Sequence, residues 1–135
     1  MYIIYFVIAS LIYFLAYTKQ AKGAYRFGLF ALFFITAFRN PILGGTDSYF
    51  YQLFFKNVPS ITHVLSYDSV YAFGYTFFNS AVKTFSDDYL MYQFIYSLTV
   101  IILLNVVIQK LDFSDKEKCI YLFTYFCFHF IWIIG

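Results

Sequence analysis

Residues 89–109 read YLMYQFIYSLTVIILLNVVIQ and set the fold class of this chain. The stretch contains no charged residue, and as an α-helix it would be about 32 Å long, enough to cross a hydrocarbon core about 30 Å thick. A membrane-spanning strand is disfavoured, because such strands alternate polar and apolar residues and this stretch is continuously apolar. It is therefore predicted to be a transmembrane helix.

The composition around this stretch indicates a membrane protein. Of the 135 residues, 62% are hydrophobic and 12% are charged, compared with about 25% charged in a soluble domain. The apolar runs predict helices over 2–18, 24–43, 89–109 and 119–135, with an outer loop over 39–88. The predicted fold is an all-α, polytopic transmembrane helical bundle of about four helices plus an outer amphipathic helix, and 1–135 are expected to form a single membrane-embedded region.

Six basic residues in two short links predict the orientation in the membrane. They are Lys19, Lys22, Arg26, Lys110, Lys116 and Lys118. Short links rich in lysine and arginine face the cytoplasm, so the N-terminus and the 39–88 loop are expected outside. No basic residue precedes the first apolar run, so we expect a first helix and not a removable signal. The last apolar run reaches Gly135 with no polar residue behind it, so we expect the N-terminal part of a larger polytopic protein.

Arg39 follows the second apolar run and is the first candidate site residue. Residues 27–38 would cover only about 18 Å as a helix, so Arg39 is expected at membrane depth. An ionisable group there costs about 2.5–3.5 kcal/mol, so the default interpretation is that it faces a polar cavity and binds a ligand. The alternative is an interfacial arginine that reaches the lipid headgroups.

The residues after Arg39 predict a turn and then a short helix. Asn40-Pro41 closes the second helix, and the amides of Gly44-Gly45 can form an anion-binding nest, although an ordinary loop is the alternative. A helix is predicted from near Thr46. Asp47 either caps that helix, which is worth about 1 kcal/mol, or acts as a general base or a partner of Arg39 across the turn.

A second helix is predicted over 70–85. Its apolar residues recur at helical spacing, and Thr76, Ser80 and Lys83 lie opposite them. Such an amphipathic helix is expected to lie along the membrane surface or to cover a cavity. Asp87-Asp88 is then expected to cap the third transmembrane helix.

The remaining chemistry-bearing residues predict structural roles. Cys119 and Cys127 would be about 12 Å apart along one helix, too far for a disulfide between them, and both are interpreted as small hydrophobic residues. His63 and His129 stand alone in the sequence. We therefore predict no metal site and no cofactor, and nothing indicates a nucleic-acid partner.

The order Arg39, Gly45-Thr46-Asp47, Tyr51 and Phe55 resembles the EpsG-type family of polysaccharide polymerases, which are similar in function to the Wzy polymerases. In that family the second helix ends in an arginine, and an outer loop with Gly-Thr-Asp and spaced aromatic residues follows. Gly74-Tyr75 also matches a Gly-aromatic pair that opens a helix there. Ala72 departs from the family, because an acidic residue is usual at that position.

The resemblance implies a glycosyltransferase-like enzyme of capsule or exopolysaccharide biosynthesis in the bacterial cytoplasmic membrane, and its partners would be the lipid bilayer and an undecaprenyl-diphosphate-linked oligosaccharide. It implies catalytic roles for Arg39, which would bind the diphosphate, and for Asp47, which would accept a proton from the acceptor sugar. Substrate-binding residues would be Gly44, Gly45, Thr46, Tyr49 and Tyr51.

Three other functions stay open. The first is a non-catalytic small membrane protein, an assembly or accessory subunit, in which Arg39 and Asp47 merely form an interfacial ion pair. The second is a fragment of a lipid-sugar transporter, although only Asn105 and His129 place strongly polar side chains inside the apolar runs. The third is a glycosyltransferase that uses a lipid phosphosugar and a different acceptor.

Overall fold

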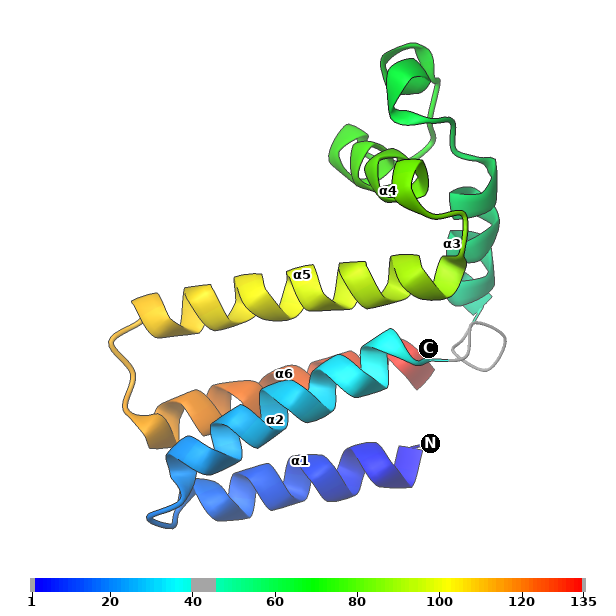
Figure 1. Cartoon of the computed structure of the whole chain (residues 1–135). Coiled ribbons are helices and arrows are strands. Elements are labelled where there is room, and N and C mark those ends of the chain that lie inside the picture. The colour runs from blue at the N-terminus through cyan, green and yellow to red at the C-terminus, as the bar shows by residue number, and fades with distance from the viewer. Residues whose placement is uncertain (1, 40–45, 135) are drawn as a thin grey trace. The chain divides into compact units, whose positions relative to one another are not determined.

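The computed structural model describes residues 2–39 and 46–134, and the side chains of residues 6–39 and 49–127 (Figure 1). All regular structure in these ranges is helical, which confirms the all-α prediction, and no strand lies in them. The elements are α1 (Tyr2–Ala16), α2 (Ala21–Ala37), α3 (Thr46–Asn57), the 3-10 helix η1 (Ile61–Ser66), α4 (Phe73–Phe85), α5 (Tyr89–Lys110) and α6 (Asp115–Ile134).

The ends of two helices differ most from the predicted bounds. The second helix ends at Ala37, six residues before the predicted bound of 43, because a residue before proline is disfavoured in a helix and Pro41 closes this stretch. α6 begins at Asp115 and not at residue 119. The cap predicted for α5 is confirmed, because the Leu90 amide donates to Oδ1 of Asp88 at 2.9 Å.

The early start of α6 has its cause in a capping box. Ser114 precedes the helix, and its amide and hydroxyl both donate to the carboxylate of Glu117, at 2.7 and 2.6 Å. These hydrogen bonds favour the charged form, so they hold the pKa of Glu117 below its ordinary value. The Ser-x-x-Glu pattern satisfies amides that the first turn would leave without partners.

One helix of the described chain, α5, combines the length and apolar composition needed to cross a membrane. A shorter apolar stretch covers Phe6–Ala16 of α1. Four spanning helices were expected, and in the described part of the chain α5 alone meets these criteria of length and composition.

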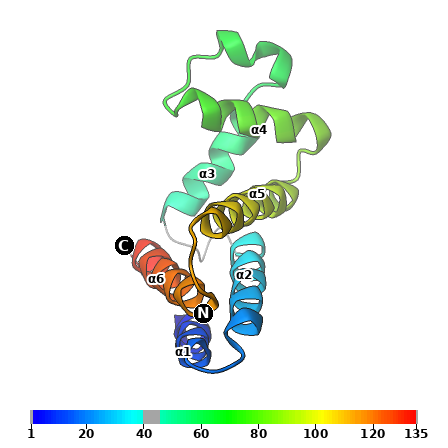
Figure 2. The same ribbon diagram turned by 90° about the vertical axis from the view of Figure 1, so that its left-hand side faces the viewer.

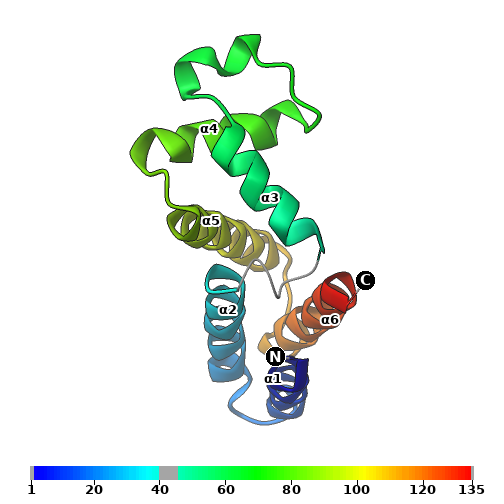
Figure 3. The same cartoon turned by 90° about the vertical axis from the view of Figure 1, so that its right-hand side faces the viewer.

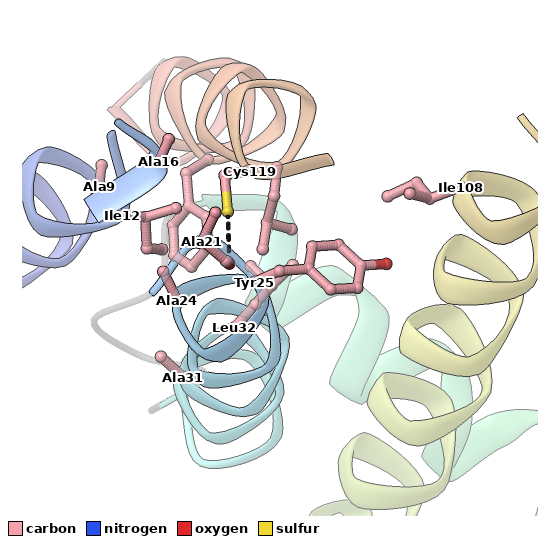
Figure 4. Close-up of a cluster of buried hydrophobic side chains, with 12 residues drawn as sticks. Ala9, Ile12, Ala16, Ala21, Ala24, Tyr25, Ala31, Leu32, Ile108 and Cys119 are labelled. Carbon is pink, nitrogen blue, oxygen red and sulfur yellow. Dashed lines mark hydrogen bonds between the residues drawn. The ribbon is translucent and has the colours of Figure 1, made fainter. Parts of the chain in front are cut away.

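The chain forms two compact units, 1–36 with 98–135 and 37–97, and α5 contributes residues to both. In the first unit α1 packs against α6, and α2 lies alongside (Figures 2 and 3). Alanines fill much of this core, namely Ala9, Ala16, Ala21, Ala24 and Ala31 (Figure 4). Small residues of this kind let helix backbones approach closely, as they do in membrane bundles.

Gly28 of α2 marks a close approach between helices of the first unit. A Cβ atom added there would lie 2.5 Å from Cδ2 of Leu122 and 2.8 Å from Cδ1 of Ile12. Glycine therefore leaves the space that these two side chains, from α6 and α1, occupy. The expectation for Cys119 as a small buried residue is confirmed, and its thiol also lies 3.0 Å from the carbonyl of Ala21 (Figure 4).

The second unit, 37–97, holds α3, η1, α4 and the first turns of α5. Its buried core consists of Phe55, Val82, Tyr89 and Tyr92. α4 packs against η1 and α3. All the described candidate site residues lie in this unit.

Candidate functional site

Arg39 is half-buried and follows the end of α2. Its carbonyl accepts a hydrogen bond from Nε2 of Gln93 at 3.0 Å, and Gln93 is itself almost completely buried on the second turn of α5. The main chain of Arg39 is therefore fixed against a helix that is long and apolar enough to span a membrane.

Tyr89 is buried one turn before Gln93 on α5. Residues four apart share one face of a helix, so Tyr89 lies on the same side of α5 as Gln93, which contacts the main chain of Arg39. The sequence did not single out either residue. The available signal was Gln93, a polar residue near the start of a mostly apolar run.

The aromatic residues of the motif lie on α3 with different exposure. Phe55 is fully buried, and its ring centroid lies 4.7 Å from that of Tyr92 and 6.0 Å from that of Tyr89. Tyr51, one turn earlier, is half-buried. Tyr49 is 51% exposed. Phe55 thus joins α3 to the same part of α5 that holds Arg39, while Tyr49 stays accessible.

Tyr51 belongs to an aromatic cluster, which also includes Phe54, Tyr71 and Tyr75. The ring of Tyr51 lies 5.9 Å from that of Tyr75 and 6.2 Å from that of Tyr71, and Phe54 stacks on Tyr75 at 5.6 Å. Burial raises the pKa of Tyr75 above its ordinary value, so its hydroxyl stays protonated. Tyr51 is therefore held by packing, with part of its surface accessible.

The other predicted site residues are only partly described. Thr46 and Asp47 are the first two residues of α3, which confirms a helix beginning there, and their side chains lie outside the described residues. Gly44 and Gly45 also lie outside them. The anion nest and the base or ion-pair role of Asp47 stay predictions.

The structure reverses a simple expectation for α4. An amphipathic helix usually buries its apolar side, yet three of the four buried residues of α4 are polar, namely Thr76, Asn79 and Ser80, and Val82 is the fourth, while Phe73, Phe77 and Phe85 are exposed. Some of the polar groups of α4 find partners inside the unit. The hydroxyl of Thr76 donates to Oγ of Ser69 at 2.8 Å.

Lys83 of α4 stabilises the end of α3. Its ammonium donates to the carbonyls of Lys56 and Val58, the latter at 2.8 Å. The last carbonyls of a helix lack partners within the helix and carry a partial negative charge, so a cation is favourable there. The sequence placed Lys83 on a polar face but could not show that α3 supplies its acceptors.

Replacing Lys83 by methionine is expected to lower the free energy of unfolding of the protein in detergent by about 1–2 kcal/mol, because two helix-end carbonyls lose a charged donor. Thermal denaturation followed by circular dichroism measures this. Lys56→Met is the matched control, because it removes the same charge from an exposed position on α3. Equal effects of the two substitutions would contradict the capping role.

Comparison of the chain with models of known protein families, with curated proteins and with solved structures finds no match. The function is therefore argued from the residues of the second unit. This unit holds a half-buried arginine whose carbonyl accepts from Gln93 of α5, and it also holds a partly accessible tyrosine on α3.

Proposed function

We propose that this chain is part of a multi-pass membrane enzyme that joins oligosaccharide repeat units carried on undecaprenyl diphosphate, at the outer face of the bacterial cytoplasmic membrane. In this proposal α1, α2, α5 and α6 are embedded in the bilayer, and the segment from Arg39 to Asp88 lies outside. The order of motif residues from Arg39 to Phe55 supports the reaction class.

The first unit supports a membrane environment. Its core is rich in alanine, whereas large aromatic residues are exposed, among them Phe6 at 71% and Phe14 at 70%. A water-soluble bundle has the reverse arrangement, with its large apolar residues inside. Small residues between helices and large ones outside fit a lipid surrounding.

The observation that carries the proposal is the hydrogen bond from Gln93 to the carbonyl of Arg39. It fixes the arginine next to the first turns of α5, where a spanning helix would meet the membrane surface. The diphosphate of a lipid-linked substrate lies at that depth. Arginine can bind two phosphate oxygens at once through its planar guanidinium group.

The proposed chemistry is the transfer of a sugar chain from undecaprenyl diphosphate to an acceptor hydroxyl. Negative charge grows on the diphosphate as the glycosidic bond breaks, so a preorganised Arg39 would stabilise the transition state more than the ground state. Asp47 would accept the proton of the acceptor hydroxyl. The Gly44 and Gly45 amides would assist on the phosphate, while Thr46, Tyr49 and Tyr51 would contact the sugars.

Deleting the gene from its host tests this proposal. Loss of a polymerase leaves single repeat units on the lipid carrier, so surface polysaccharide should shift from long chains to one unit when separated by size. Complementation with the gene should restore long chains. An unchanged chain-length distribution after deletion would favour a non-catalytic membrane protein.

A further inference from the structure

The outward side of α4 is apolar. Phe73 is 60% exposed, Phe77 44% and Phe85 87%, and Val70, just before the helix, is 95% exposed. The three phenylalanines follow helical spacing, so they share one side. We call these four residues the α4 apolar face.

No charged residue of α4 lies on this face, and the nearest charges along the chain are the exposed Asp68 and Asp87 at its two ends. The only charged residue within α4 is Lys83, and its ammonium is used on the carbonyls of α3. The other residues exposed along the helix, Gly74 and Thr84, are uncharged. The hydroxyl of Thr84 donates to the carbonyl of Ser80 at 2.9 Å, so it too is satisfied by its own helix. This surface therefore presents few groups that could form hydrogen bonds with water.

The inward side of α4 carries three polar residues beside the core residue Val82, and some of its polar atoms lack partners in the described part of the chain. Asn79 donates from Nδ2 to the carbonyl of Tyr75 at 2.7 Å, but Oδ1 of Asn79 and Oγ of Ser80 are buried without a hydrogen-bond partner among the described residues. Burying such oxygens costs free energy. In water, a helix rotated the other way would expose them and bury the phenylalanines. The observed rotation is favourable where the outer medium is apolar.

The chain connection places this face close to the proposed membrane. α4 ends at Phe85 and α5 begins at Tyr89, and since an extended residue spans at most about 3.6 Å, their ends lie within about 14 Å of each other. At the start of α5, Leu90, Met91 and Phe94, together with Asp88, line a shallow hollow of about 210 Å³.

From the absence of charge, the inverted polarity and this connection, we propose that the α4 apolar face lies in the bilayer interface, with lipid acyl chains as its partner. The proposal rests on the membrane insertion of α5 that the proposed function includes. In this arrangement α4 lies on the membrane beneath the outer segment. Its contact with lipid would hold Lys83 and the end of α3 at a fixed depth.

Tryptophan fluorescence in vesicles tests this proposal. The chain contains one tryptophan, so Trp132→Phe provides a background without tryptophan, into which Phe77→Trp is introduced. Phe78→Trp is the matched control one residue away, because Phe78 is half-buried and packs against Tyr92 and Tyr96. Leu103→Trp, at an exposed position of α5, reports on membrane insertion. The probes are brominated phosphatidylcholine and aqueous iodide.

For Phe77→Trp we expect a blue-shifted emission. Brominated lipid should quench this emission more strongly than that of Phe78→Trp, and iodide should reduce it little. Quenching by iodide would overturn the proposal, because the face would then meet water. Quenching by neither probe would also overturn it, because the face would then be covered by protein. If lipid quenches Leu103→Trp but not Phe77→Trp, the inference about α4 fails while membrane insertion stands. If lipid quenches neither, both fail.

Discussion

Arg39→Ala is expected to lower the rate of polymer formation by about 10²–10³-fold, the loss typical of removing one preorganised donor to a developing negative charge. The hydrogen bond from Gln93 should persist, because its acceptor is the carbonyl of residue 39. The rate is measured as chain growth in membranes that carry the variant, supplied with lipid-linked oligosaccharide extracted from the host.

Arg39→Lys is expected to retain an intermediate rate, because lysine keeps the charge but cannot bind two phosphate oxygens with one planar group. Arg26→Ala provides the control. It removes the only other arginine of the chain, which is exposed on α2. This residue belongs to a link that is predicted from the sequence to face the cytoplasm. Full activity of Arg39→Ala, or equal losses from the two alanine variants, would remove Arg39 from the mechanism.

Phe55→Ala is expected to lower the free energy of unfolding of the second unit by about 3–5 kcal/mol, the usual cost of removing a fully buried phenylalanine. Its ring contacts Tyr89 and Tyr92, so the substitution leaves a cavity between α3 and α5. Thermal denaturation in detergent, together with limited proteolysis of the outer segment, measures the loss.

Phe50→Ala is the matched control for Phe55→Ala. Phe50 lies on the same helix but is 53% exposed, so its removal should change stability by less than about 1 kcal/mol. The polymerisation rate of Phe55→Ala should also fall, because α3 would lose its attachment to the part of α5 that holds Arg39. Similar melting temperatures for the two variants would contradict the packing described for α3.

Local signals in the sequence were enough to predict several elements. The start of α3 at Thr46, the helix predicted over 70–85 and observed over 73–85, and the cap at Asp88 all follow from residue spacing and cap chemistry. The predicted bound of 43 for the second helix lay past Asn40-Pro41, the pair expected to close it, and α2 ends at Ala37. These features depend on neighbours within a few residues.

Features that depend on distant residues could not be predicted in the same way. The periodicity of 70–85 separates a polar from an apolar side, but it does not say which side meets the rest of the protein. Lys83 finds its acceptors 25 and 27 residues away. Gln93 finds the carbonyl of Arg39 at a separation of 54 residues. No spacing rule links such pairs, so these contacts were found only in the structure.

Binding of undecaprenyl diphosphate to the chain in lipid nanodiscs addresses the role of Arg39 without any knowledge of the sugar. We predict that the wild-type protein binds the diphosphate at least about tenfold more tightly than undecaprenyl monophosphate, and that Arg39→Ala loses this preference. Equal affinity of the wild-type protein and Arg39→Ala for the diphosphate would contradict the proposed diphosphate site.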